Sequence, residues 1–222
     1  MLSKLKFLTS GESHGRGLLG IIDGIPYGLE LTEDYIGFHL SRRQKGYGRG
    51  GRMKIEKDFA EIYSGVRHGY SLGSPIGLLI RNKDWENWTK KMDIKKSDDP
   101  IKKVTLPRPG HADLAGVLKY GFDDIRNVLE RSSARETTMR VALGSICRKF
   151  LEELGIHVAS RVVQIHDLID KTDIPKEISI IELNKIADKS EVRCLDKNIE
   201  LKMLEKIDEA KSSGDSVGGI FE

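Results

Sequence analysis

The sequence predicts a globular protein of mixed helices and strands, with its sheet concentrated in the first third. Fifteen of the 23 glycines fall within the first 77 residues, where they separate short β-prone runs. A helical apolar period dominates 134–154, and strand-like and helix-like segments follow it. With 222 residues, 38% of them apolar, the chain is long enough to bury a sizeable core.

The first third contains one predicted helix among its strands. The predicted strands are 5–9, 20–23, 59–66 and 76–81. The helix follows Thr32, a residue suited to the N-cap, and has Glu33 and Asp34 in its first turn. Ile36 and Leu40 lie one turn apart, which places them on a single apolar face.

The segment 93–103 is charged, contains proline and has no apolar period, so we expect an exposed loop there. The strongest predicted helix covers 134–154 and ends at Gly155. Its core positions are the apolar residues Met139, Leu143, Ile146, Cys147, Phe150, Leu151 and Leu154.

Beyond Gly155, the β-branched residues of 156–165 predict a strand, and helices follow at 180–187 and 198–212. Gly214 ends the last helix, and 217–221 begins a further strand. We expect this final strand to be unpaired and the fold of residues 1–222 to be incomplete.

The composition restricts the class of protein. The net charge of +3 is too small to indicate a polyanionic partner. Cys147 and Cys194 have no metal-ligand or redox spacing, which favours a reducing compartment and two unreactive thiols. No signal-peptide pattern and no membrane-spanning apolar run occurs, so we expect a cytoplasmic protein with no membrane partner.

Four segments combine residues that suggest chemistry, and the first is 11–15, GESHG. Its glycines let the backbone approach a ligand, and the imidazole of His14 can exchange protons near neutral pH. A tight turn with a surface histidine is the structural alternative, and local pattern alone favours it.

The second segment, 42–52, carries most of the six basic residues found between Arg42 and Lys54, a stretch with no acidic residue. Arginine binds phosphate or carboxylate through two parallel hydrogen bonds, and glycines expose backbone N–H groups. A solvated basic loop and a single-stranded nucleic-acid site remain equal alternatives to an anion site.

The third segment, 107–113, places His111 after two prolines and before an apolar-periodic stretch, so a stiff loop-to-helix junction would aim its ring. An ordinary residue at a helix N-terminus is as good an interpretation. The fourth segment, 130–138, joins two arginines to a helix N-terminus, which predicts an anion site. Ser133 followed by Glu136 also predicts a capping box, and both interpretations can hold.

No metal-ligand cluster, Ser/His/Asp signature, Walker loop or Rossmann glycine pattern is present, and we expect no bound metal. Two histidines and several arginine-rich anion sites remain. That combination suits proton transfer on a substrate with several negative charges.

Taken together, four segments in this order resemble the chorismate synthase family. They are GESHGRGLLGIIDGIPYG at 11–28, RRQKGYGRGGRMKIE at 42–56, RPGHADL at 108–114 and DIRNVLERSSARETTMRVA at 124–142. The resemblance extends to SGDSVGGIFE at the end of the chain, although typical family members are substantially longer.

The resemblance implies a carbon–oxygen lyase of the shikimate pathway, which supplies aromatic amino acids. Its reaction would be the anti-1,4-elimination of phosphate from 5-enolpyruvylshikimate 3-phosphate, giving chorismate. Reduced FMN would be required without net redox change, with NADPH as a reductant. His14 matches the family histidine thought to protonate the reduced flavin, and His111 the one thought to protonate the departing phosphate.

The resemblance also implies binding residues. Substrate or anion binding would fall to Ser13, Arg43, Arg49 and Arg135. Cofactor binding would fall to Arg43 and Arg49, as nicotinamide-nucleotide contacts, and to Arg131, Ser132 and Ser133, against FMN.

The family fold would be an α+β protein, a β-α-β sandwich built as two related halves and assembled as a homotetramer. Residues 1–222 would then be the N-terminal part of a single domain, containing the first half of that fold. Two other functions remain as alternatives: an inactive fragment that binds anions or flavin, and an RNA-binding protein using the basic glycine-rich segment.

Overall fold

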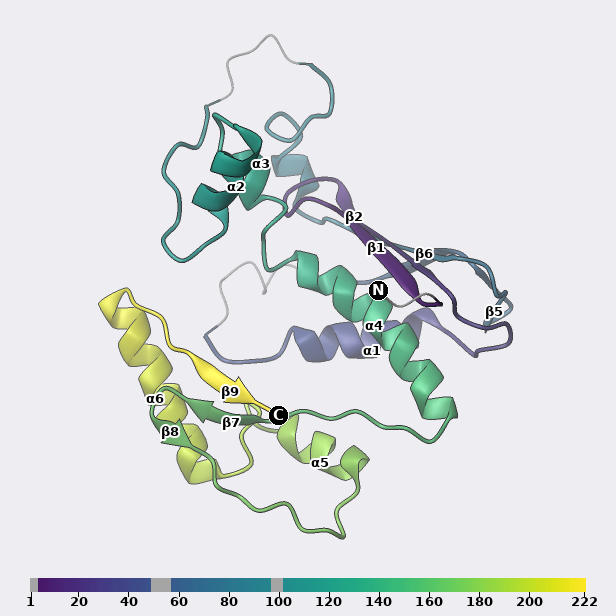
Figure 1. The fold of residues 1–222 in the computed structure, drawn as a ribbon, viewed down its shortest axis with the longest axis vertical. Coiled ribbons are helices and arrows are strands. Elements are labelled where there is room, and N and C mark those ends of the chain that lie inside the picture. The colour runs from purple at the N-terminus through teal and green to yellow at the C-terminus, as the bar shows by residue number, and fades with distance from the viewer. Residues whose placement is uncertain (1–3, 49–56, 97–101) are drawn as a thin grey trace. The chain divides into compact units, whose positions relative to one another are not determined.

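The structure is a computed structural model that describes residues 4–48, 57–96 and 102–222 (Figure 1). The chain divides into two compact units. The first comprises Met1–Leu40 and Ile55–Phe150, and the second comprises Ser41–Lys54 and Leu151–Glu222. Each unit is described by itself. The expectation that 1–222 forms part of a single domain stays a prediction.

The first unit is built on a four-stranded antiparallel sheet in the order β1-β2-β6-β3. The strands are β1 (Lys6–Gly11), β2 (Gly17–Asp23), β3 (Glu61–Ser64) and β6 (Ile76–Arg81). Side chains alternate along β2 and β6, so Leu18, Ile22, Leu78 and Ile80 are buried on one face. This alternation explains why the β-prone runs of the sequence become the central strands.

Two helices cover that buried face: α1 (Glu33–Arg43) and α4 (Glu136–Glu153). Ile36 of α1 and Met139 of α4 are fully buried in the same apolar cluster. A Cβ atom at Gly20 of β2 would collide with the Met139 side chain, so a glycine there lets α4 pack close to the sheet.

Shorter elements complete the first unit around the sheet. They are the hairpin of β4 (Val66–Arg67) and β5 (Tyr70–Ser71), the 3-10 helix η2 (Trp85–Asn87), and helices α2 (Asp113–Tyr120) and α3 (Arg126–Leu129). Figure 1 shows α2 and α3 next to each other beyond one end of the sheet. The segments that carry the candidate histidines lie next to these elements.

The second face of the sheet is apolar and exposed. Leu8 of β1 is 75% exposed, and Leu19 and Ile21 of β2 are 53% and 50% exposed. These residues share one face because Leu8 pairs with Ile21 and strand side chains alternate. An exposed apolar face of this kind is typical of a surface that another element or subunit covers.

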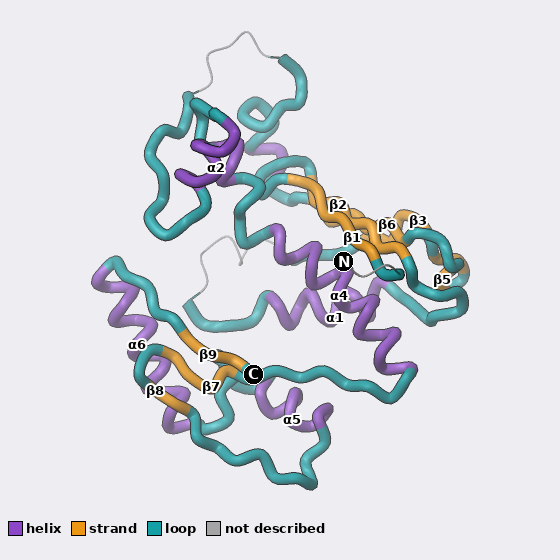
Figure 2. Tube along the Cα trace, in the orientation of Figure 1, coloured by secondary structure: helices purple, strands orange, loops and turns teal. Residues whose placement is uncertain are grey.

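The second unit holds a three-stranded antiparallel sheet in the order β8-β7-β9, with helices α5 (Ile180–Ala187) and α6 (Lys197–Ser213). Its strands are β7 (Val162–Ile165), β8 (Leu168–Ile169) and β9 (Gly219–Phe221), seen side by side in Figure 2. In this unit the Asp170 carboxylate accepts from the Cys194 thiol and the Leu195 N–H, and Arg193 donates to Asp188.

Most of the predicted elements are confirmed. The predicted helix at 180–187 and strand at 76–81 have the predicted bounds, and the helix predicted at 134–154 covers Glu136–Glu153. The Thr32 hydroxyl accepts from the Tyr35 N–H at 3.2 Å, as an N-cap should. The antiparallel sheets with separate helices confirm the α+β fold class.

Three strand predictions need correction. The strand predicted at 59–66 is interrupted by Gly65, whose φ of 82° takes the chain out of the extended conformation. The strand predicted at 156–165 begins only at Val162, because its partner β9 is three residues long. The final strand was expected to be unpaired, but β9 pairs with β7. Among the described residues, no helix is long and apolar enough to cross a membrane.

Candidate active site

The loop that carries His14 joins β1 to β2, and hydrogen bonds from Asn82 hold it in place. Asn82 follows β6 and is only 6% exposed. Its Nδ2 donates to the carbonyl oxygens of Ser13 at 2.6 Å and Gly15 at 2.7 Å. Gly11, where β1 ends, has a φ of 109°, a conformation that only glycine adopts without strain. The His14 loop is therefore rigid.

Glu130 binds His14 through both its main chain and its ring. The His14 N–H donates to Glu130 Oε2 at 2.8 Å, and His14 Nδ1 lies 2.9 Å from Oε2 and 3.0 Å from Oε1. The Ser13 N–H also donates to the Glu130 carbonyl oxygen at 3.0 Å. Glu130, which follows α3, is 2% exposed. These bonds join residues more than a hundred positions apart in the sequence.

Trp88 and Arg126 complete the surroundings of this pair. The Trp88 ring stacks on His14 with centroids 3.8 Å apart, and its Nε1 donates to Asp84 Oδ2 at 2.7 Å. The Arg126 guanidinium lies 5.5 Å from the Trp88 ring centroid and donates to Glu130 Oε1 at 3.2 Å. The plane of the His14 imidazole is thus set by an aromatic neighbour and its edge by a carboxylate.

The Glu130 carboxylate is ionised at neutral pH. Burial by itself raises the pKa of Glu130, but the hydrogen bonds from the His14 ring and main chain outweigh it. The charges of His14 and Arg126 act in the same direction, so the pKa lies below its usual value. A buried negative charge therefore faces the imidazole.

His111 lies at a loop-to-helix junction, as predicted, two residues before α2 begins at Asp113. Its Nδ1 is 2.7 Å from Asp113 Oδ1 and 2.9 Å from Arg108 Nη2. Arg108 also donates from Nε and Nη2 to the Asp113 carboxylate, which is 1% exposed. The hydrogen bond from Arg108 is the main cause that lowers the pKa of Asp113 far below its usual value.

The two histidine anchors influence each other electrostatically. The hydrogen bond to Asp113 raises the pKa of Arg108 against the opposing effect of burial, and the charges of Asp113 and Glu130 add to the rise. The Glu130 carboxylate that holds His14 therefore acts on the guanidinium that contacts His111. Both histidines belong to the first unit.

At the N-terminus of α4, some of the predicted anion-binding side chains are exposed to solvent and others are already bound to protein groups. Arg131 donates from Nη2 to the carbonyl oxygen of Thr9 at 2.9 Å, while its side chain stays 41% exposed. Ser132 is exposed. Arg135 is 8% exposed, and its Nη1 donates to Asp58 Oδ1 at 2.9 Å. A substrate anion would compete with Asp58 for Arg135.

The predicted capping box at the start of α4 is wrong. The Ser133 hydroxyl accepts from the Arg135 N–H at 3.3 Å. The Glu136 carboxylate accepts from Thr9 Oγ1 and Arg140 Nε, both at 2.7 Å, instead of turning back to Ser133. Arg140 lies one helical turn further on, and its charge makes it the stronger partner.

The described part of the basic segment is fastened within the second unit. Arg42 donates from Nε to Asp188 Oδ2 at 2.7 Å, and the Tyr47 hydroxyl donates to Asp208 Oδ2 at 2.6 Å. An arginine and an aromatic ring that a nucleic acid would need are thus bound to carboxylates. This arrangement disfavours the RNA-binding alternative.

Of the two predicted binding residues of this segment, the structure describes Arg43 but not Arg49. Arg43 is half-buried at the end of α1 and belongs to the second unit. Arg49 lies outside the described residues. Their roles as anion and nucleotide contacts stay predictions.

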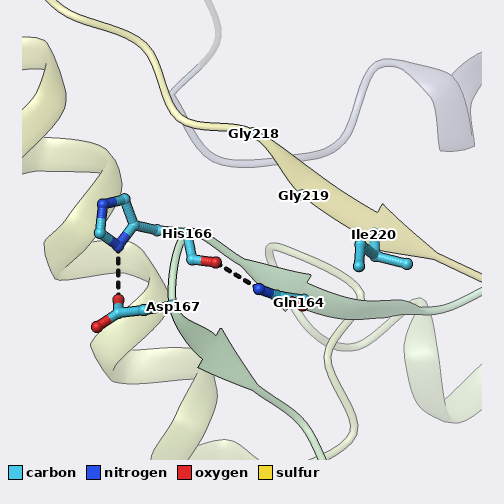
Figure 3. A pocket seen from close by; sticks show the side chains of 6 residues that line it. All are labelled: Gln164, His166, Asp167, Gly218, Gly219 and Ile220. Carbon is cyan, nitrogen blue, oxygen red and sulfur yellow. Dashed lines mark hydrogen bonds and ion pairs between the residues drawn. The ribbon is translucent and has the colours of Figure 1, made fainter.

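A recess of about 540 Å³ in the second unit is a weaker candidate (Figure 3). His166 Nδ1 lies 2.6 Å from Asp167 Oδ1, but the two side chains are 54% and 68% exposed. Water screens such a pair, so it contributes little. The lining residues are Gln164, His166, Asp167, Gly218, Gly219 and Ile220.

Sequence reasoning did not assign the residues that hold the histidines: Glu130, Asn82 and Trp88. Asp113, two positions after His111, carried the clearest local signal, because a carboxylate near a histidine commonly orients it. Glu130 gave no comparable signal, since its partner is 116 positions away.

The sequence model of the family named chorismate synthase matches residues 5–222. The chorismate synthase of Geobacillus sp. (strain WCH70) is 53% identical over 221 residues, covering 98% of this chain and 56% of that protein. The chorismate synthase of Enterococcus faecalis (strain V583) is 52% identical with the same coverage. The chain therefore spans about half the length of the curated relatives it matches.

The fold agrees with these similarities. A solved structure titled "Crystal Structure of Chorismate Synthase" superposes with a TM-score of 0.78 and 42% identity, covering all of this chain and 57% of that one. The family model, the relatives and the solved structure all name the same family, and each matches almost the whole chain. The chain belongs to the chorismate synthase family.

Proposed function

We propose that this chain supplies the histidine-bearing part of a chorismate synthase active site. The reaction is the anti-1,4-elimination of phosphate from 5-enolpyruvylshikimate 3-phosphate, in which the C–O bond to phosphate breaks and a ring proton leaves. The proposal combines membership of the family with two histidines, each held through Nδ1 by a buried carboxylate.

The observation that carries the proposal is the Nδ1 anchoring of both rings. An imidazole bound at Nδ1 has its Nε2 edge left for a substrate, which is how a general acid or base is oriented. Both rings are partly accessible, with side-chain exposures of 21% for His14 and 28% for His111. They are accessible enough to meet a ligand and too constrained to turn freely.

His111 is suited to the leaving phosphate. The Arg108 guanidinium lies within hydrogen-bond distance of His111 Nδ1, and the Arg108 side chain is 46% exposed, so a fixed positive charge is available to a phosphate beside the ring. His111 would donate a proton to the departing phosphate, while Arg108 would stabilise its charge. The two carboxylates of the substrate would need further hydrogen-bond donors, and we propose Arg135 and Ser13 as their contacts.

The head of α4 fits the phosphate of reduced FMN. The exposed Ser132, the partly exposed Arg131 and the N-terminus of an 18-residue helix together provide hydroxyl, guanidinium and backbone donors. We assign FMN binding to Arg131, Ser132 and Ser133, and nicotinamide-nucleotide contacts to Arg43 and Arg49. When bound, reduced FMN supplies electron density to the allylic system of the substrate.

Assembly as a homotetramer is part of the proposal. Leu8, Leu19 and Ile21 form the exposed apolar sheet face of the first unit, a surface that favours association. Changing Leu19 to Lys should then lower the sedimentation coefficient of the protein. Unchanged sedimentation would exclude this face from the subunit contact.

The test of function measures chorismate and phosphate after the chain is mixed anaerobically with substrate and chemically reduced FMN. Because the chain spans 56% of the Geobacillus relative, a parallel reaction contains the remaining part of that relative as a separate polypeptide. We expect little turnover from the chain alone and turnover that depends on His14 and His111 in the combined reaction.

An exposed histidine provides the matched control. His166→Ala should leave turnover unchanged, because that ring lies in the water-exposed recess. The proposal fails if the combined reaction forms chorismate equally well with His14→Ala and His111→Ala. A titration of the chain with labelled oligonucleotide at several salt concentrations tests the RNA alternative, which predicts tight, salt-dependent binding.

A further inference from the structure

Glu130 has a geometry that its position in the sequence did not predict. Both carboxylate oxygens lie within hydrogen-bond distance of His14 Nδ1, and Oε2 also accepts the His14 N–H. Its side chain is 1% exposed, so water does not compete for these bonds. Three contacts between two residues fix both the position and the rotation of the imidazole.

We propose that Glu130 is the positioning residue that holds His14 in the tautomer with its proton on Nδ1, so that proton exchange takes place only at Nε2. The catalytic consequence rests on the proposed function, but the tautomer itself does not. The free imidazole of histidine in water favours the opposite tautomer, with the proton on Nε2. The protein would therefore have to impose the Nδ1 form.

The donors around Glu130 determine the direction of the hydrogen bond. An ionised carboxylate only accepts, so a neutral imidazole facing it must donate from Nδ1. Oε2 already accepts from the His14 N–H and Oε1 from Arg126 Nη1 at 3.2 Å. A protonated Glu130 would turn one of these oxygens into a donor facing another donor. The surroundings thus favour the ionised form.

Trp88 opposes a flip of the ring, the movement that would take Nδ1 away from Glu130 and so release the constraint on the tautomer. Its indole stacks on the imidazole at 3.8 Å and is itself held by Asp84. A flip of the His14 ring would place a carbon where Nδ1 lies and would leave a buried carboxylate without its ring partner, which is costly. Among the described residues, no group hydrogen-bonds Nε2.

Two roles follow for Glu130 in the proposed reaction. It keeps the lone pair or the proton of Nε2 in a fixed direction, and its charge stabilises the imidazolium when Nε2 is protonated. Glu130 touches His14 rather than the substrate, so it acts through the histidine. It is a positioning residue and not a catalytic one.

The decisive experiment is nitrogen NMR of the chain labelled with ¹⁵N-histidine, recorded at a pH where the exposed rings are neutral. Two-bond proton–nitrogen correlations separate the two tautomers, and the His14→Ala variant identifies the His14 signals. We expect His14 Nδ1 to carry the proton, while the exposed His166 shows the mixture typical of free histidine. A His14 ring with the same mixture as His166, or with its proton on Nε2, would overturn the proposal.

Glu130→Gln provides the matched change, because its amide has nearly the same shape but only one acceptor oxygen. We expect His14 to lose its exclusive Nδ1 proton, whereas Asp167→Asn should leave the His166 signals almost unchanged. An unaltered His14 tautomer in Glu130→Gln would also overturn the proposal. Should this variant fail to fold, the spectrum of the unmodified chain still decides.

Turnover separates this inference from the proposed function. In the combined reaction, Glu130→Gln should lower turnover by about ten- to a hundredfold with little change in KM, and Glu130→Asp should restore part of it. If the tautomer is as proposed but His14→Ala does not lower turnover, the proposed role of His14 is wrong and the positioning by Glu130 stands. If turnover depends on His14 but the tautomer is mixed, the reverse holds.

Discussion

His14 and His111 are both bound at Nδ1 by a buried carboxylate, yet the charges that face that nitrogen differ. His14 Nδ1 faces the two oxygens of Glu130. His111 Nδ1 faces Asp113 Oδ1 at 2.7 Å and also Arg108 Nη2 at 2.9 Å. A guanidinium only donates and an ionised carboxylate only accepts, so the His111 nitrogen can use either partner.

The difference suits the two histidines to the different tasks proposed for them. The environment of His14 specifies a single tautomer and places negative charge behind the ring. The environment of His111 leaves the tautomer open and brings a guanidinium beside the ring, where a departing phosphate would benefit from it. Buried carboxylates orient both rings, and the neighbouring arginines determine what each ring can do.

The largest expected effect comes from removing the rings. In the combined reaction, His14→Ala and His111→Ala should each lower turnover by roughly two to four powers of ten, the usual contribution of a positioned general acid, with a smaller change in KM. Steady-state rates at saturating reduced FMN give both constants.

The arginine at the head of α4 is the contrasting case. Arg135→Ala should raise KM together with the loss of rate, because in the proposed site Arg135 would bind an anion that is present before the reaction. Histidine variants that lose affinity but keep near-normal turnover would show that the rings belong to the anion-binding wall. The same contrast applies to Arg49→Ala.

The second prediction concerns Asp113, whose carboxylate accepts three hydrogen bonds from Arg108 and also contacts His111 Nδ1. Asp113→Asn should destabilise the first unit by about 2–3 kcal/mol, because a buried acceptor for Arg108 and His111 is lost. The lowered pKa of Asp113 means that its contribution is present above the usual carboxyl pKa and disappears as the pH falls through its lower folded value. Denaturant unfolding at neutral pH measures the change, and a loss below the experimental error would contradict it.

Asp170 is a buried carboxylate that accepts from backbone N–H groups and a thiol, so it shows how much a buried carboxylate stabilises the fold when it does not hold a histidine. Asp170 is 4% exposed and accepts from the Thr172 and Leu195 N–H groups at 2.9 and 2.8 Å. Burial raises its pKa, but these hydrogen bonds and that of Cys194 outweigh burial and lower the pKa to about 2.

Because the folded pKa of Asp170 is depressed, its stabilisation is present above about pH 4 and lost as the pH falls towards about 2. The amount is roughly 2 kcal/mol. Asp170→Asn should remove this part of the acid sensitivity, measured as the difference between unfolding free energies above and below the transition. An identical pH profile for variant and parent would contradict the assignment.

The smallest effect is expected at the exposed pair in Figure 3. Asp167→Asn should leave both turnover and unfolding midpoint unchanged, because an ion pair with side chains more than half exposed is screened by water. A large effect there would mean that exposure does not distinguish this pair from those of His14 and His111. The comparison would then lose its physical basis.

The sequence alone determined the elements whose signals are local. The period of apolar residues located α4, the Thr32 cap and acidic first turn located α1, and Gly155 and Gly214, with φ near 71° and 72°, ended helices as expected. The glycine-bracketed and proline-stiffened junctions made His14 and His111 candidates, and the family resemblance selected them over the structural alternatives. Each of these signals is contained within one or two helical turns of sequence.

Only the tertiary structure decided what those histidines are bound to and how strands end. Glu130 lies 116 residues from His14 and Asn82 lies 69 from Ser13, and no local period links such pairs. The bounds of β7 depended on its partner β9 for the same reason. Buried polar groups choose partners by proximity after the chain has folded, because each must replace the water it has lost.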